Sequence, residues 1–82
     1  MKPEISNLHL RMCNAVAKTR LQMKTDERET AAVIAIATRM RDATRSNVDR
    51  EALTGIIAAG RYLRDGDDFQ AIRTLRKVKA EG

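Results

Sequence analysis

The stretch "RDGDDFQAIRTLRKVK", residues 64–79, contains the end of one predicted helix and the whole of the next. Gly66 is predicted to end the first helix, because glycine readily takes the left-handed conformation of a helix C′ residue. Asp67 or Asp68 follows at once and can cap a new helix. The stretch therefore predicts two helices that meet at Gly66.

The second of these helices has an apolar stripe. Phe69, Ile72, Leu75 and Val78 recur every three residues, and Ala71 supports them. Spacing of this kind places side chains along one side of a helix. We expect this stripe to pack against the protein core.

A longer helix, over residues 48–64, precedes the turn. Ser46 and Asp49 have the spacing of a capping box, which predicts its start. Its buried face is expected to consist of Ala52, Leu53, Ile56, Ala59, Gly60 and Leu63. Gly55 and Gly60 each cost about 1 kcal/mol inside a helix relative to alanine. We expect them to mark places where another backbone comes close.

A further helix is predicted upstream of the segment "TRSNVDREA", residues 44–52, in which one helix ends and the next begins. Thr25 or Asp26 can serve as its N-cap, and Asp26 with Glu29 again has capping-box spacing. Its buried face is expected to consist of Ala32, Val33, Ile36, Ala37, Met40 and Ala43.

The first predicted helix covers residues 6–24, with Ser6 as its cap. Its main apolar face consists of Ile5, Leu8, Met12, Ala15, Val16 and Met23. Leu10, Ala17 and Leu21 form a second apolar flank. This helix is therefore expected either to be central in the fold or to meet a partner as well.

Four helical patterns without strand alternation predict an all-α fold, a compact bundle of four short helices in one domain, residues 1–82. The alternative is three helices with a loosely docked first helix. Hydrophobic residues make up 43% of the chain, but Tyr62 and Phe69 are the only aromatic residues. The core is therefore expected to be aliphatic, which suits closely packed helices.

The segment "AAGRYLRDGDDFQAIRTLRKV", residues 58–78, resembles the middle of a tetratricopeptide repeat. The positions that match are Ala59, Tyr62, Gly66, Asp67, Ala71, Leu75 and Val78. The resemblance implies a tight antiparallel helical hairpin at the C-terminal end. It departs from the family at Gly55, where a bulky aromatic residue is preferred, and in the absence of the later proline and of a second repeat.

Few residues point to chemistry. His9 and Cys13 could meet at i, i+4, but two ligands do not make a zinc site, so a structural thiol is expected. Asp65, Asp67 and Asp68 are explained by capping. We predict no enzyme, metal or cofactor. A single Cys and the lack of a signal-like or membrane-spanning apolar run favour a cytoplasmic protein.

Positive charge is concentrated at the two ends of the chain. The net charge is +5, and residues 8–24 and 69–79 contain no acidic residue. In an up-down-up-down bundle the first and last helices are neighbours, so their cations could form one basic surface. The candidate partner-binding residues are Arg11, Lys18, Arg20, Lys24, Arg73, Arg76, Lys77 and Lys79.

These features predict a small non-enzymatic protein-binding module: an adaptor or inhibitor that docks on a larger protein with an acidic surface. Phage-encoded antagonists of host machinery are comparable in size. The alternative is a basic protein that contacts DNA or RNA phosphates through its first and last helices. A moderate charge excess and the lack of stacking aromatics favour the protein partner. Homodimerisation through the two middle helices is a third hypothesis.

Overall fold

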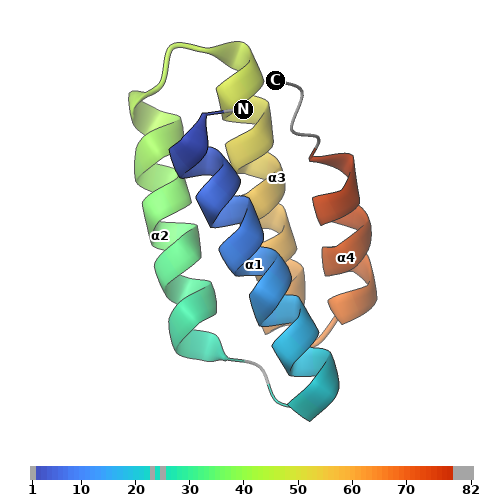
Figure 1. Cartoon of the computed structure of the whole chain (residues 1–82). Coiled ribbons are helices and arrows are strands. Elements are labelled where there is room, and N and C mark those ends of the chain that lie inside the picture. The colour runs from blue at the N-terminus through green and yellow to red at the C-terminus, as the bar shows by residue number, and fades with distance from the viewer. Residues whose placement is uncertain (1, 23, 25, 79–82) are drawn as a thin grey trace.

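The structure is a computed structural model that describes residues 2–22, 24 and 26–78, and these residues form four α-helices. The helices are α1 (Pro3–Gln22), α2 (Glu27–Ala43), α3 (Asn47–Arg64) and α4 (Asp68–Lys77), shown in Figure 1. The predicted all-α bundle with a C-terminal antiparallel hairpin, α3 and α4, is confirmed. None of the described helices is long and apolar enough to cross a membrane.

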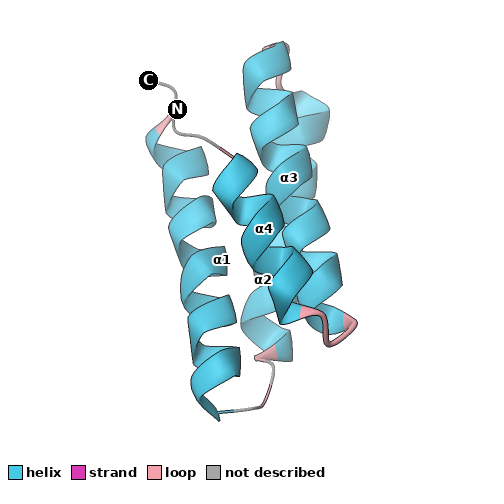
Figure 2. Ribbon diagram, turned by 90° about the vertical axis from the view of Figure 1, so that its right-hand side faces the viewer, coloured by secondary structure: helices cyan, strands magenta, loops and turns pink. Residues whose placement is uncertain are grey.

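Successive helices run in opposite directions, and α1 and α3 lie at the centre of the contact pattern. Each of these two contacts all three other helices, while α2 and α4 lie on either side of them (Figure 1). The predicted contact between the first and last helices is therefore present. Figure 2 shows α1 along one edge of the molecule. One side of α1 thus faces the core, and the opposite side faces solvent.

The start of α1 differs from its prediction. The helix begins at Pro3, and the N–H of Ser6 donates to the carbonyl oxygen of Lys2 at 2.9 Å. Ser6 therefore lies inside the first turn and is not the cap. Proline suits the first helical position because its missing N–H would have no partner there in any case.

The other three helix starts are capped as the sequence predicts. Asp26 accepts the N–H of Glu29 at 3.1 Å, and Ser46 accepts the N–H of Asp49 at 3.2 Å. Asp67, rather than Asp68, caps α4. Each cap satisfies one backbone donor that the helix itself leaves unpaired.

Gly66 ends the α3 segment as expected. Its φ angle is +83°, in the left-handed region. The N–H of Gly66 donates to the carbonyl of Leu63, and the N–H of Asp67 donates to the carbonyl of Tyr62. This pair of bonds is a Schellman motif, which closes the helix and turns the chain into α4.

The core is aliphatic, as predicted. Its buried hydrophobic residues are Ile5, Leu8, Met12, Ala15, Val16, Val33, Ala37, Leu53, Ile56, Ile57, Ala59, Leu63, Ala71 and Leu75. Three buried residues, Ile57, Thr30 and Asp49, were not expected. Thr30 is accommodated because its hydroxyl donates to the carbonyl of Asp26 at 2.8 Å. Ala43, predicted to be buried, is exposed at the end of α2, and Met23 lies outside the described residues.

Phe69 does not pack against the core, contrary to the prediction. It is 65% exposed, whereas Ala71 is fully buried. Residues three apart rotate by about 60° around a helix, so a stripe of i, i+3 steps drifts away from a fixed direction. The helix α4 is oriented by Ala71 and Leu75 in its middle, and this orientation turns Phe69 outward.

Both glycines of α3 lie where neighbours come close, but these neighbours are side chains and not the backbone that the sequence led us to expect. A Cβ atom at Gly60 would lie 2.7 Å from Cγ1 of Ile34 and 2.8 Å from Cε of Met12. A Cβ atom at Gly55 would meet Cγ2 of Val78. The missing side chains therefore leave room for residues from α1 and α2 at one site, and from the end of α4 at the other.

Candidate functional site

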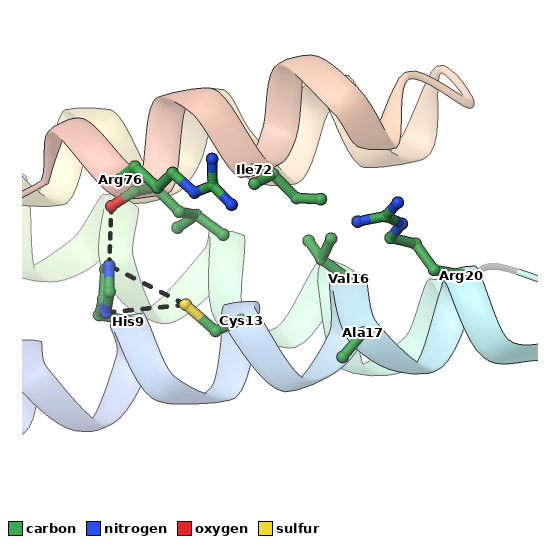
Figure 3. Close-up of a pocket in the computed structure, with 8 residues that line it drawn as sticks. His9, Cys13, Val16, Ala17, Arg20, Ile72 and Arg76 are labelled. Carbon is green, nitrogen blue, oxygen red and sulfur yellow. Dashed lines mark hydrogen bonds between the residues drawn. The ribbon is translucent and has the colours of Figure 1, made fainter.

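A groove runs between α1 and α4. Its volume is about 270 Å³, and side chains from both helices form its walls (Figure 3). The lining residues are His9, Cys13, Val16, Ala17, Arg20, Ile72, Leu75 and Arg76. Small-molecule sites usually have volumes of about 300–1,000 Å³. The groove lies just below that range, which fits one or two inserted protein side chains better than a cofactor.

Two arginines border the apolar part of this groove. Figure 3 shows the guanidinium groups of Arg20 and Arg76 on either side of Ile72. Nε of Arg20 lies 3.4 Å from a carboxylate oxygen of Asp68, in the first turn of α4. Arg76 is exposed and forms no ion pair with any described residue. The groove therefore combines an apolar floor with positive charge at its rim.

His9 connects α1 to the last turn of α4. Its Nε2 lies 3.0 Å from the carbonyl oxygen of Leu75. A carbonyl can only accept a hydrogen bond, so Nε2 must carry a proton and donate. The Nδ1 atom lies 3.8 Å from Sγ of Cys13, the i, i+4 approach that the sequence allowed. His9 thus holds two helices together at one end of the groove.

Cys13 lies half-buried beside His9. Burial raises the pKa of the Cys13 thiol. A thiol of raised pKa is rarely ionised near neutral pH, and the thiolate is the reactive form. Among residues 2–22, 24 and 26–78, no group of three or more His, Cys, Asp or Glu side chains could hold a metal ion.

Two of the predicted binding residues, Arg11 and Lys18, face α2 and not α4. Arg11 donates two hydrogen bonds to the carboxylate of Glu29, at 3.2 and 2.6 Å. Nζ of Lys18 lies 3.3 Å from Asp26. These cations are two helical turns apart, and they fasten α1 to the first turn of α2. We call these two ion pairs the α1–α2 clasp.

The clasp changes the acidity of its carboxyl groups. The hydrogen bond from Arg11 lowers the pKa of Glu29, and Arg11 itself has a raised pKa because of the same bond. The N–H of Glu29 and then the ammonium of Lys18 lower the pKa of Asp26. Both carboxylates are therefore stabilised in their charged form. This is expected because the N-terminus of a helix and adjacent cations both favour negative charge.

The remaining cations lie elsewhere. Arg73 and Lys77 are exposed on α4, and Lys24 is exposed between α1 and α2. Lys79 lies outside the described residues. The structure thus brings Arg20 and Arg76 together at the groove, with Arg73 and Lys77 on the same helix as Arg76. Of the seven predicted residues that the structure describes, Arg11 and Lys18 lie beside α2 and not at the groove.

The apolar floor of the groove was absent from the residues predicted to bind a partner. Ile72 was assigned to the core stripe of its helix, and Ala17 to the second apolar flank of the first helix. That second flank was the available signal, because a helix with two apolar sides is either central in the fold or exposes one of them to a partner. Which residues of this flank lie beside α4 depends on how α1 is rotated in the bundle. The sequence of one helix alone does not determine that rotation.

Comparison of this chain with protein-family models, curated proteins and solved structures finds no match. The tetratricopeptide resemblance of residues 58–78 accordingly stays a prediction.

Proposed function

We propose that this chain is a small non-enzymatic protein-binding module, an adaptor or inhibitor, that docks on a larger protein through the groove between α1 and α4. One observation carries this proposal: an open apolar groove is bordered by two arginine guanidinium groups. Protein interfaces are enriched in arginine, and their strongest contacts bury apolar anchors in pockets.

The partner that fits this site presents a bulky apolar side chain flanked by carboxylates. The apolar side chain would contact Ile72 and Val16. The carboxylates would pair with Arg76 and with the terminal nitrogens of Arg20, whose Nε lies beside Asp68. Arg73 and Lys77 add positive charge on the exposed side of α4. Long-range attraction between this face and an acidic partner would accelerate association. We place this interaction in the cytoplasm, because a lone Cys provides no internal disulfide.

The alternative partner is a nucleic acid, favoured by the exposed and closely spaced Arg73, Arg76 and Lys77 of α4. Two observations support the protein partner instead. Arg11 and Lys18, which a phosphate-binding face would have used, form ion pairs with α2. The groove floor is apolar, whereas phosphate contacts require only cations and hydrogen-bond donors.

The test is a pull-down from a nuclease-treated lysate with two variants of equal net charge. Arg20→Glu/Arg76→Glu reverses the groove rim, and Arg39→Glu/Arg45→Glu reverses two exposed arginines on and just after α2. We expect the same protein to be captured by the wild type and by the α2-side variant, and to be lost or at least about tenfold reduced with the groove variant.

Equal capture by both variants would exclude the groove as the binding site. Loss of all captured protein after nuclease treatment would favour the nucleic-acid alternative. Binding to a DNA duplex that falls steeply with added salt and weakens on Arg73→Glu/Lys77→Glu would establish it.

A further inference from the structure

The side of α1 that faces away from the core carries a second apolar feature, which shares Ala17 with the groove. Leu10, Asn14, Ala17 and Leu21 follow one another at steps of four, three and four residues, and all four are exposed. Leu10 is 56% exposed and Leu21 is 86% exposed. Alternating steps of three and four are the a/d spacing of a coiled coil. We call these four residues the outer stripe.

The position of α1 makes the outer stripe accessible to another helix. The helix lies along one edge of the bundle, with α2 and α4 on either side of it (Figures 1 and 2). The buried residues Leu8, Met12 and Ala15 hold its opposite side to the core. The stripe is thus presented on a preformed helix, and a second helix could bind it without first having to induce helical structure.

We propose that the outer stripe pairs with the same stripe of a second copy of this chain, in parallel orientation and in register. In heptad terms, Leu10 and Ala17 occupy d positions, and Asn14 and Leu21 occupy a positions. Parallel pairing places a against a, so the two Asn14 side chains meet and can hydrogen-bond to each other. Asn7, one heptad before Asn14 and also exposed, is a further a position, so the same pairing sets Asn7 against Asn7. An asparagine at an a position is known to specify parallel, in-register dimers.

Other arrangements of the stripe leave at least one of the two Asn14 side chains against an apolar residue. In antiparallel pairing an a position faces a d position, so Asn14 would lie against an apolar side chain. A buried polar group without a hydrogen bond costs about 1–3 kcal/mol. A parallel pair shifted by one heptad would set Asn14 of one copy against Leu21 and incur the same cost, while Asn14 of the other copy would face Asn7.

The charges beside the stripe favour the same orientation. Arg11 and Lys18 flank it on one side, and Cys13 and Arg20 flank it on the other. Antiparallel pairing would set Arg11 of each copy near Lys18 of the other, a like-charge contact that the clasp carboxylates Glu29 and Asp26 offset only in part. Parallel pairing instead sets Cys13 near Lys18, at the i, i+5 relation of facing flanks. Charge and the Asn14 side chain therefore favour one geometry.

The stripe covers fewer than two full heptads, and one of its members is alanine. The contact belongs with small, weakly associating interfaces rather than with obligate dimers. Light scattering or sedimentation from about 5 µM to 1 mM should show the mass rising from 9.2 kDa toward twice that value. A protein that stays monomeric throughout this range would refute the proposal.

Two charge-introducing variants test which surface is responsible. Leu10→Glu/Leu21→Glu should remain monomeric, with an unchanged helical spectrum because both side chains are exposed. Val48→Glu/Phe69→Glu alters two equally exposed hydrophobics away from the stripe and should still dimerise. Dimers that persist in the first variant would place the interface elsewhere. The groove variant Arg76→Glu, on α4 and outside the flanks of the stripe, should also dimerise, so failure of the groove proposal and failure of this one give different results.

Cysteine cross-linking tests orientation and register. In a Cys13→Ala background that keeps Asn14, Leu10→Cys should form a disulfide-linked dimer rapidly under mild oxidation, because facing d positions of a parallel, in-register pair lie within disulfide reach. Arg39→Cys, exposed on α2, serves as the control and should cross-link at least about tenfold more slowly. Equal rates for the two variants would contradict the in-register parallel pair.

Discussion

At the scale of single residues, small side chains determine how closely the helices approach. Gly60 is buried, and the space beside it is filled by Ile34 of α2 and Met12 of α1. One missing methyl group thus lets side chains from two other helices meet α3 at the same point. Glycine is a poor helix former, but its small size at position 60 allows the three helices to pack closely.

We predict that Gly60→Ala destabilises the protein by about 1 kcal/mol. A clash of this kind costs about 1–3 kcal/mol, and only about 1 kcal/mol is recovered from the better helix propensity of alanine. Urea unfolding followed by circular dichroism measures the change. In an Ile34→Ala background the loss should shrink, because that change removes the atoms nearest the new methyl group. A more stable Gly60→Ala protein would show that the site has room to spare.

At the scale of helices, the α1–α2 clasp shows how charge positions α1. Arg11 and Lys18 pair with the two carboxylates that begin α2. The same carboxylates also stabilise the N-terminus of α2, where the helix dipole is positive. The first turn of α2 therefore has two roles, starting its own helix and fixing the position of another.

We predict that Glu29→Gln lowers the free energy of unfolding at neutral pH by a few tenths to about 1 kcal/mol, the range for partly exposed ion pairs. The pKa of Glu29 is lower in the folded protein than in the unfolded chain, where it is about 4.3. Its contribution is therefore complete above that value and is lost as pH falls through the folded pKa. The difference between wild type and variant, measured by urea unfolding from pH 7 to pH 2, should vanish in acid.

Glu27→Gln is the matched control for this experiment. Glu27 lies in the same helical turn and is exposed, and it forms no ion pair with any described residue. Its substitution removes the same charge from the N-terminus of α2 but leaves the clasp intact, so the loss should be smaller. If both variants lose equal stability, the helix dipole explains the effect and the clasp does not.

The features that the sequence predicts well are local ones. The caps Asp26, Ser46 and Asp67 and the stop at Gly66 depend on residues within one turn, so their chemistry can be recognised without the fold. The orientation of Phe69 and the pairing of Arg11 with Glu29 depend on how whole helices are rotated against one another. The candidate groove is of this second kind, since its walls come from helices at opposite ends of the chain.

At the scale of the whole molecule, α1 is an integral part of the core. It contributes Ile5, Leu8, Met12, Ala15 and Val16 to the buried residues. A protein of this size has a free energy of unfolding of roughly 4–12 kcal/mol, so the loss of one large core side chain is a substantial fraction of the total. The loosely docked first helix considered from the sequence is thus not what the structure shows.

We predict opposite results for two substitutions on the two sides of α1. Met12→Ala removes a fully buried side chain and should cost about 2–5 kcal/mol. Leu21→Ala, at a position that is 86% exposed, should change stability by less than about 0.5 kcal/mol. Urea unfolding at low protein concentration, where self-association does not contribute, gives both values. A small loss in the free energy of unfolding of Met12→Ala would contradict the integral role of α1 in the core.

The central place of α1 also has a consequence for protein synthesis. Of the four helices, α1 is synthesised first. Its core face contacts α3, whose synthesis is complete only at Arg64. At about 5–20 residues per second, the ribosome adds the intervening stretch in roughly 2–8 s. During that interval the nascent chain exposes the apolar side chains that will later be buried. Chaperones that bind short apolar segments would therefore bind the nascent chain during this interval. Their binding site would become buried once α3 has emerged and folded against α1.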